Sequence, residues 1–238
     1  MDSPAYVTLS RQTGLARELD VIANNIANAS TTGFRRQGVV FAEHMRPAGD
    51  APALSMARAH GRSIDSAQGA LRQTNGRYDF AIEGAGFFLV ETPGGERLTR
   101  AGHFLPDAEG TLVTPQGHRL LDAGGAPVAV PPLAAAISLA ADGTLSADGV
   151  PVAQIGLFLP ADPARLRHEA DALLDSGAGT VPAERVSLHQ GFLEESNVNP
   201  MTEMTRLITV QRSYELAQRF LDREDERLRG ALQTLGRS

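Results

Sequence analysis

Apolar and polar positions alternate with a helical period at the two ends of the chain, and with a different rhythm between them. Near the N-terminus the apolar residues recur three and four positions apart, the spacing that places them on one face of a helix. These residues are Leu19, Ile22, Ala23 and Ile26. Ser3-Pro4 opens the segment as a cap followed by proline at the first helical position. The pattern predicts a helix from about residue 4 to residue 28.

Three asparagines accompany this apolar stripe. Asn24, Asn25 and Asn28 fill the other face of the predicted helix, although asparagine is a mediocre helix former whose side chain competes for backbone hydrogen bonds. We therefore expect their amides to bond groups outside the helix, and favour neighbouring subunits as the source of those groups. The run Ala29 to Gly33 that follows is typical of a cap or turn, so the helix should end there.

A second helix is predicted at the C-terminus. Asn199-Pro200 repeats the device of a cap followed by proline. Residues at a strict seven-residue interval follow: Leu207, Tyr214, Leu221, Leu228 and Leu235. Their companion positions are polar in the middle: Met204, Gln211, Gln218, Asp225 and Leu232. Strict heptads predict left-handed supercoiling against a partner helix, and polar companions specify its register.

The middle of the chain has no helical period. Residues 35–66 are interrupted by glycine and proline, which predicts an extended, irregular connector. From about residue 67 to residue 190, short apolar runs alternate with turn signals, as in an all-β region. A weak repeat, EGTLVTPQG at 109–117 and DGTLSADG at 142–149, predicts hairpins in that region.

Composition narrows the functional classes. With 238 residues and 42% hydrophobic residues the chain can bury a core, and it contains no cysteine for disulfides or thiolate metal sites. A net charge of -6 without a basic block argues against nucleic-acid binding. All 22 basic residues are arginine, which is explained by genomic composition bias or, less simply, by bidentate pairing at subunit contacts. No stretch reaches the ~18 to 20 apolar residues of a membrane span, and no basic signal-peptide n-region begins the chain.

Candidate catalytic chemistry is sparse. The chain lacks nucleophile-elbow, zinc-protease, phosphate-loop and dinucleotide-binding motifs, and its six histidines are widely separated. Asp107, Asp142 and other acids beside glycine fit hairpin turns better than calcium ligation. Glu194-Glu195 invites comparison with a catalytic carboxylate pair, but adjacent side chains point apart, so we interpret both as surface charge. We expect no catalytic residues, no cofactor, no metal and no small-molecule substrate.

Three blocks of the chain together resemble one known family. The segment IANNIANASTTGFRRQ is similar to the N-terminal signature of the bacterial flagellar rod and hook proteins. YDFAIEGAGFFLV and the following RLTRAGHFLPDAEGTLVTPQGHRLL resemble the opening of that family's central β-domain, and EESNVNPMTEMTRLITVQRSYE resembles its C-terminal module. The blocks occur in the family's order and span nearly the whole chain. The length and the N-terminal start are most similar to the proximal-rod members.

The resemblance implies an architecture and a set of assembly residues. The fold would be a mainly β central domain (67–190) plus an α-helical coiled-coil domain formed by the N-terminal helix (1–34) and the C-terminal helix (191–238), with the connector at 35–66. Helix packing and assembly would use these residues: Leu19, Ile22, Asn24, Asn25, Ile26, Asn28, Thr32, Gly33, Phe34, Ser196, Asn197, Asn199, Leu207, Gln211, Arg212, Tyr214, Leu221, Leu228 and Leu235.

The resemblance also implies a function. The chain would be a structural subunit of the flagellar rod that stacks helically on copies of itself and on other rod proteins, after contact with the flagellar export apparatus and export without a cleaved signal. It would lie in the periplasmic part of the basal body, in the drive shaft around the export channel. A distal-rod or hook-type subunit is the alternative within the family, and a periplasmic enzyme acting on cell-wall glycan is the alternative outside it.

Overall fold

The computed structural model describes residues 3–48, 51–184 and 187–235, and the chain divides into two compact units. The first, here called the helical unit, contains Met1–Ala27, Gln37–Ser63 and Asn199–Ser238. The second, here called the β unit, contains Asn28–Arg36 and Ile64–Val198. A mostly β central region between an N-terminal and a C-terminal helix agrees with the predicted fold class. The segments 28–36 and 191–198, which the sequence grouped with the helices, belong to the β unit.

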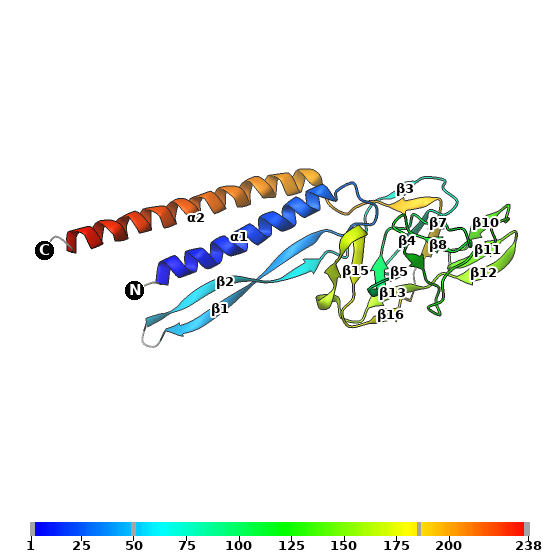
Figure 1. The fold of residues 1–238 in the computed structure, drawn as a ribbon, viewed down its shortest axis with the longest axis horizontal. Coiled ribbons are helices and arrows are strands. Elements are labelled where there is room, and N and C mark those ends of the chain that lie inside the picture. The colour runs from blue at the N-terminus through cyan, green and yellow to red at the C-terminus, as the bar shows by residue number, and fades with distance from the viewer. Residues whose placement is uncertain (1–2, 49–50, 185–186, 236–238) are drawn as a thin grey trace. The chain divides into compact units, whose positions relative to one another are not determined.

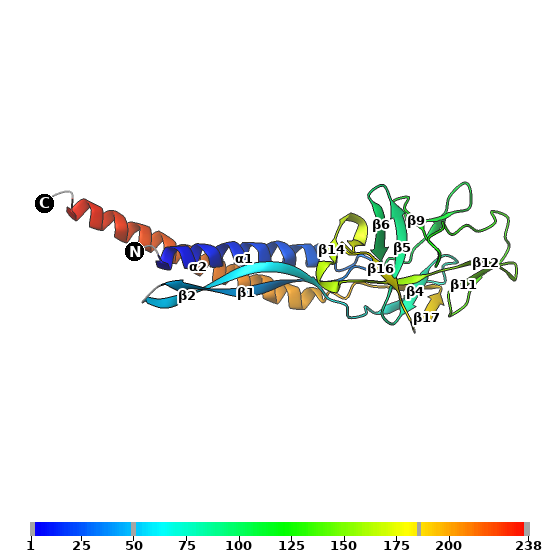
Figure 2. The same ribbon diagram turned by 90° about the horizontal axis from the view of Figure 1, so that it is seen from below.

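The helical unit consists of two antiparallel helices and a hairpin. Helix α1 (Ser3–Ala27) and helix α2 (Pro200–Leu235) lie side by side and run in opposite directions (Figure 1). The longer α2 continues past the N-terminal end of α1. Strands β1 (Gln37–Ala48) and β2 (Ala51–Ile64) pair with each other, and β1 packs along α1 (Figure 2). None of the helices in the described ranges is long and apolar enough to cross a membrane.

The hairpin corrects the sequence prediction of an irregular connector at 35–66. Pro47 lies in β1 and Pro52 lies in β2, although prolines in this segment favour an irregular chain without regular strands. A two-stranded sheet has only edge strands, and an edge strand tolerates proline because one side of its backbone needs no ladder partner. Glycine and proline therefore do not exclude long paired strands here.

The least exposed positions of α2 correct part of the heptad prediction. Leu207, Tyr214 and Leu221 are half-buried, as the seven-residue interval predicts, but their companions Met204, Gln211, Gln218 and Asp225 are exposed. The positions that do complete the seam lie one residue earlier: Glu203, Val210, Ala217 and Glu224. These residues alternate with the heptad positions at spacings of four and three, and Glu203 and Val210 are fully buried. The side chains of Leu228, Leu232 and Leu235 lie outside the described part of the structure.

Short antiparallel strands build the β unit, as the alternating turn signals predict. Its largest sheet contains nine strands: β5 (Phe87–Thr92), β6 (Gly95–Thr99), β7 (Leu105–Pro106), β8 (Leu112–Val113), β9 (Arg119–Leu120), β13 (Leu157–Pro160), β14 (Arg167–His168), β15 (Leu173–Asp175) and β16 (Thr180–Pro182). A three-stranded sheet contains β10 (Ile137–Leu139), β11 (Thr144–Ala147) and β12 (Val150–Gln154). Two single pairs join β4 (Phe80–Glu83) to β17 (Ser187–Gln190) and β3 (Leu71–Gln73) to β18 (Phe192–Glu194). Single 3-10 turns occur at Pro163–Arg165 and Ala170–Ala172.

The two repeated segments form hairpins in different sheets, and the acids beside glycine act in turns. β8 pairs with β9, and β11 pairs with β12. Asp107 Oδ1 accepts hydrogen bonds from the backbone N–H groups of Glu109 and Thr111, at 3.0 and 2.7 Å. Asp142 Oδ1 accepts a hydrogen bond from the backbone N–H of Thr144 at 2.9 Å, and this bond lowers the pKa of Asp142. The predicted turn chemistry is confirmed at both acids.

Phenylalanines fill the centre of the β unit. Phe80, Phe88 and Phe104 are fully buried, and the rings of Phe88 and Phe104 meet edge to face at 5.4 Å between centroids. Aliphatic side chains from several sheets surround them in one cluster. This core includes Phe80 and Ile82 of β4, and the β3–β18 pair carries Glu194, a residue of the site described next.

Candidate functional site

The signature loop, residues 28–36, leaves α1 and folds into the β unit. The helix ends at Ala27, as predicted from the Ser-Thr-Thr-Gly run. Thr31 N–H donates to the Asn28 carbonyl at 3.1 Å, and Thr31 Oγ1 donates to Asn28 Oδ1 at 3.2 Å. Phe34 N–H then donates to the Thr31 carbonyl at 3.2 Å. Two successive turns, both closed by local hydrogen bonds, thus replace the next turn of helix.

Gly33 lies where this loop meets the rest of the β unit. Its φ of +70° is in the left-handed region that favours glycine. Its N–H donates to the backbone carbonyl of Glu194 at 2.8 Å. A Cβ built at this position would lie 2.3 Å from both Ala101 N and Arg100 C, which are backbone atoms. Glycine is therefore required twice, by its backbone conformation and by the close approach of a second chain segment.

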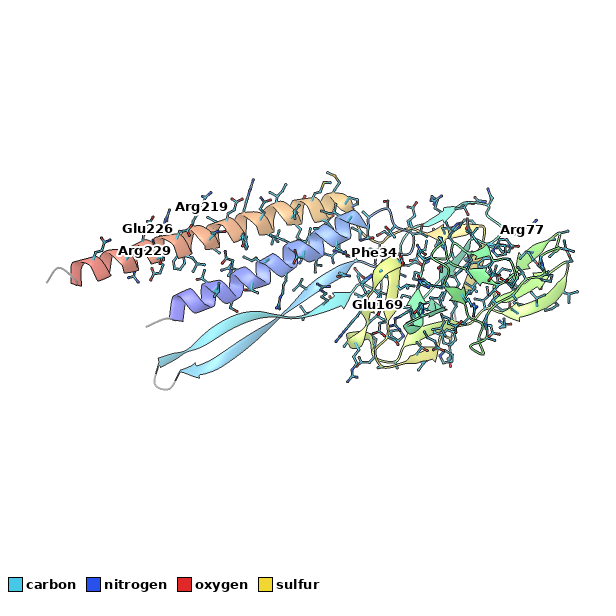
Figure 3. All side chains as sticks on the ribbon, viewed as in Figure 1. Phe34, Arg77, Glu169, Arg219, Glu226 and Arg229 are labelled. Atoms are coloured by element: carbon cyan, nitrogen blue, oxygen red, sulfur yellow. The ribbon has the colours of Figure 1, made fainter. Side chains whose placement is uncertain are left out.

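Phe34 and Asn197 connect the signature loop with the Asn-rich segment before α2. Phe34 is buried, and its ring centroid lies 4.9 Å from that of His168 in β14 (Figure 3). Asn197 Oδ1 accepts a hydrogen bond from the Arg36 backbone N–H at 2.6 Å, and its Nδ2 donates to the carbonyl of Ala67 at 2.8 Å. Asn197 N–H also donates to the Phe34 carbonyl at 3.4 Å. One asparagine side chain therefore joins three segments of the β unit.

Two arginines share one buried carboxylate beside this junction. Arg35 Nη1 lies 2.9 Å from Glu194 Oε1, and Arg100 Nη1 lies 2.9 Å from Glu194 Oε2. All three side chains are at most 3% exposed. Gly69 N–H adds a bond to Glu194 Oε1 at 2.8 Å, and Arg100 Nη2 donates to the Gly84 carbonyl at 2.6 Å. We call Arg35, Glu194 and Arg100 the buried triad.

The buried triad carries one positive charge more than it carries negative charge. Burial lowers the pKa of Arg35, and burial lowers the pKa of Arg100 to about 10, against the opposing effect of the Glu194 carboxylate. The Arg100 guanidinium therefore keeps its charge at neutral pH. Arg100 also lies over the Phe87 ring, 5.2 Å from its centroid, which compensates part of the excess charge. Glu194 is thus the carboxylate that both cations share, and Asp65 adds a weaker attraction at Arg35.

Glu194 corrects the interpretation of Glu194-Glu195 as surface charge. Glu195 does lie at the surface, half-exposed in an ion pair with Arg72, whereas Glu194 is 1% exposed. The two-residue period of a strand indicates that one of the two faces inward, but which one depends on the register of β18 with β3, where Glu194 pairs with Leu71. Sequence reasoning did not identify Arg35 and Arg100 as site residues either, because only the fold shows that their shared partner Glu194 faces inward.

A second polar junction lies within the helical unit. Asn25 is 0% exposed, and its side-chain amide makes two hydrogen bonds with the backbone of Gln37. Asn25 Nδ2 donates to the Gln37 carbonyl at 2.9 Å, and the Gln37 N–H donates to Asn25 Oδ1 at 2.9 Å. Asn25 Nδ2 also lies 3.3 Å from Glu203 Oε2 of α2. The amide therefore joins α1, β1 and α2. The expectation that Asn25 faces neighbouring subunits together with Asn24 is wrong in this respect, because its donor and acceptor are used within the chain.

Exchanging Asn25 for alanine should destabilise the helical unit by about 1–3 kcal/mol, because it leaves the Gln37 backbone N–H and C=O groups without their buried partner and removes one contact of Glu203. Asn24→Ala is the matched control, since Asn24 is exposed and substitutions at exposed sites usually change stability by about 0.5 kcal/mol or less. Urea unfolding of the two variants, followed by far-ultraviolet circular dichroism, measures the difference. Equal stabilities of the two variants would contradict the buried role of Asn25.

Other predicted residues of the helical unit have diverse environments. Ile22 is fully buried, Leu19 and Ile26 are half-buried, and Ala23 is exposed. The inward stripe of α1 instead includes Glu18 and Val21, and Glu18 Oε1 pairs with Arg206 of α2 at 2.7 Å. An acid on one predicted helix and a base on the other are visible in the sequence, and together they favour such an ion pair between the helices.

The entry to α2 agrees with its predicted cap. Asn199 Oδ1 accepts hydrogen bonds from the N–H groups of Met201 and Thr202, at 3.1 and 3.2 Å. Just before it, Ser196 Oγ accepts one from Val198 N–H at 3.2 Å. Farther along α2, Gln211 and Arg212 are exposed, as are the labelled side chains of Arg219 and Arg229 (Figure 3).

These junctions pack distant segments of one chain against each other. The buried carboxylates of Glu194 and Glu203 are fully engaged with partners of the same chain. Over the ranges that the structure describes, no three His, Asp or Glu side chains gather closely enough to hold a metal ion. The features that the sequence singled out meet instead at the two places where chain segments far apart in sequence converge.

Comparison with known proteins identifies the same three blocks. Family models described as "Flagella basal body rod protein", "Flagellar hook protein FlgE/F/G D1 domain" and "Flagellar basal body rod FlgEFG protein C-terminal" match residues 6–35, 81–147 and 189–234. The signature loop thus closes the first block. The third block contains Glu194, Asn197 and the start of α2.

Relatives match over the full length. The flagellar basal-body rod protein FlgF of Caulobacter vibrioides is 41% identical, over 100% of this chain and 99% of its own. The protein of the same name from Mesorhizobium japonicum is 38% identical, over 99% of both chains. The flagellar basal-body rod protein FlgG of Bacillus subtilis is 32% identical, over 93% of this chain and 94% of its own.

Proposed function

The chain belongs to the flagellar basal-body rod protein family, and from this premise we propose that it is a proximal-rod subunit that assembles through its paired terminal helices. The family is structural and non-enzymatic, so the chain is a structural rod component and the alternative of a glycan-acting enzyme is set aside. Membership also implies assembly with other rod proteins. The finer assignment to the proximal rod is supported by the full-length similarity to proteins named FlgF.

The observation that carries the assembly proposal is an apolar face on α2. The half-buried and buried positions of α2 form one side of the helix, the seam toward α1. Large apolar side chains recur on the opposite side, at roughly whole-turn spacings. They are Met201, Met204, Ile208, Leu216 and Phe220, each 47% to 73% exposed. A large exposed apolar surface of this kind marks a protein interaction site. In a rod subunit, we expect a helix of a neighbouring subunit to pack on this face.

Pairing of α1 with α2 as an inner coiled coil is the second part of the proposal. Alternating spacings of four and three at the less exposed positions of α2 support it. The Glu18–Arg206 ion pair and the Asn25–Glu203 contact provide polar register marks between the helices. Stacking of such subunits head to tail generates an open helical tube. The tube surrounds the export channel of the drive shaft.

Replacing Leu216 with glutamate should abolish rod assembly and motility while the monomer stays folded. The side chain is 64% exposed, so a charge there costs the isolated chain little, whereas in an assembly it would lie in an apolar contact. A complemented deletion strain tests motility, and circular dichroism of the purified variant tests folding. Gln218→Glu is the control, because it adds the same charge at an exposed position outside the apolar face.

A motile strain with Leu216→Glu would contradict the role of the apolar face, whatever happens to the control. Axial position is tested separately, by locating the tagged protein in isolated basal bodies. The proximal assignment predicts that the tag lies in the cell-proximal part of the rod. A tag beyond that part would favour the distal-rod alternative. Export through the flagellar apparatus without cleavage predicts that the assembled chain retains its N-terminal residues.

A further inference from the structure

A cavity of about 590 Å³ opens in the β unit beside the signature loop. Thr32 of that loop lines it, together with residues from β6, the β8–β9 turn and the 3-10 turn before β15. The volume is within the range of about 300–1,000 Å³ that is usual for ligand pockets. Its lining differs from the usual one, because it contains no Phe, Tyr or Trp and is rich in hydroxyl, amide and carboxylate groups. The cavity therefore suits a polar occupant rather than a flat apolar one.

His103 lines this cavity and is held by a buried carboxylate. Its Nδ1 lies 2.6 Å from Oδ1 of the buried Asp79, and Asp79 Oδ2 accepts a hydrogen bond from Thr74 Oγ1 at 2.5 Å. A carboxylate only accepts, so Nδ1 carries the proton of this contact. Nε2 is the ring nitrogen that remains for an occupant.

Unlike His103, three other side chains that line the cavity make no hydrogen bond or ion pair with the part of the chain that the structure describes. They are Thr32, Gln116 and Asp171. Asp171 has a φ of +61° and is followed by Ala172 at +56°, a left-handed pair that is uncommon outside glycine. Thr99 Oγ1 donates to the Ala172 carbonyl at 3.3 Å and holds this turn at the cavity edge. The turn thus keeps an unpaired carboxylate at the rim.

The acceptors at the cavity have no cationic partner among its lining residues. Although the chain contains 22 arginines, none of the lining residues is an arginine, and His103 is the sole basic side chain among them. The Asp171 carboxylate and the Gln116 side-chain carbonyl are acceptors, and the complementary group is one that only donates. A guanidinium has five donors and no acceptor in a planar fork.

We propose that this cavity is a socket for an arginine side chain presented by an adjacent copy of this chain in the rod. The inference rests on the proposed function, because it requires subunits to stack. Charge complementarity supports this occupant over others: arginine is the only cationic residue type in the chain besides histidine, and the socket offers an unpaired carboxylate with neutral acceptors around it. The socket would fix the rotation of one β unit on the next, whereas the apolar face of α2 provides the affinity.

The chemistry of the socket is tested on the full-length monomer with N-acetylarginine amide as the probe. Its titration should shift the NMR signals of His103, Gln116 and Thr32 saturably. N-acetylcitrulline amide, which has the same shape without the charge, should not shift them. Asp171→Asn should weaken binding by about tenfold, which corresponds to ~1.4 kcal/mol, because asparagine tolerates the left-handed backbone but carries no charge. Glu109→Gln, an exposed acid outside the cavity, is the control and should bind like the wild type.

The occupant is tested by cross-linking, which is simple here because the chain contains no cysteine. Gln116→Cys is expressed together with a panel of chains in which each exposed arginine is in turn changed to cysteine, and the isolated basal bodies are oxidised. One member of the panel should give a disulfide-linked pair of copies. Equal binding of the arginine and citrulline probes would overturn the proposal. So would assembled basal bodies in which Gln116→Cys links to no arginine position, or to a different rod protein. None of these results would affect the role of the α2 face.

Discussion

Gly33→Ala is expected to lower the free energy of unfolding of the β unit by about 2–5 kcal/mol and to abolish motility. The left-handed backbone at φ +70° costs a side-chain-bearing residue about 1–2 kcal/mol. The added Cβ would meet Ala101 N and Arg100 C at 2.3 Å, and relief of an overpacked contact costs about 1–3 kcal/mol more. Those backbone atoms cannot retreat easily, because the Arg100 side chain is anchored on Glu194. Urea unfolding with hydrogen exchange of the β-unit amides measures the loss.

Gly117→Ala separates the two contributions. Gly117 has a φ of +89°, but a Cβ at this position meets nothing within 4 Å. We therefore expect its substitution to cost only the backbone contribution of about 1–2 kcal/mol and to preserve motility. If Gly33→Ala and Gly117→Ala destabilise the β unit equally, the close approach of the signature loop to Ala101 does not constrain the fold.

Local signals allowed the helix ends to be predicted well. Ser3-Pro4 and Asn199-Pro200 correctly predicted where α1 and α2 begin, since a cap and its proline act on neighbouring backbone groups. The glycine of the signature loop likewise marked the turn after α1. The β character of the central region followed from its turn residues. These features depend on a few successive residues, which a single sequence displays in full.

Features that depend on a distant partner were not predictable in the same way. The heptad spacing predicts Met204 as a companion position, yet Glu203 is the buried residue, opposite Asn25. Burial of a carboxylate costs free energy unless a hydrogen-bond donor lies beside it, and here that donor lies on another element. The β1–β2 hairpin escaped prediction for a related reason, because pairing between two edge strands leaves little periodic signal. The socket at His103 could not be foreseen either, because its walls come from segments that only the fold brings together.

Glu194→Gln is expected to have an effect comparable to that of Gly33→Ala, for an electrostatic reason. It removes the carboxylate that pairs with both Arg35 and Arg100, which are at most 3% exposed, and removal of one partner from a buried ion pair costs about 3–5 kcal/mol. Glu195→Gln is the matched control at the adjacent residue. Its ion pair with Arg72 is half-exposed, and such pairs contribute about 0–1 kcal/mol. Calorimetry of the full-length variants measures the difference.

A triple variant, Arg35→Met with Glu194→Leu and Arg100→Met, distinguishes unpaired charge from lost packing. If the cost of Glu194→Gln comes from two uncompensated guanidiniums, removal of all three charges should recover most of the lost stability, since apolar replacements of buried charge clusters are often neutral or stabilising. Recovery should be incomplete by about 1–3 kcal/mol, because Gly69 N–H loses its acceptor at Glu194 Oε1. In the wild type, added salt should weaken the half-exposed Glu195–Arg72 ion pair more than the buried pairs of Glu194, since buried charges are screened least. A triple variant as unstable as Glu194→Gln would show that the triad acts through shape rather than charge. With recovery, Glu194 is the counter-ion that lets the signature loop and the segment before α2 share one core.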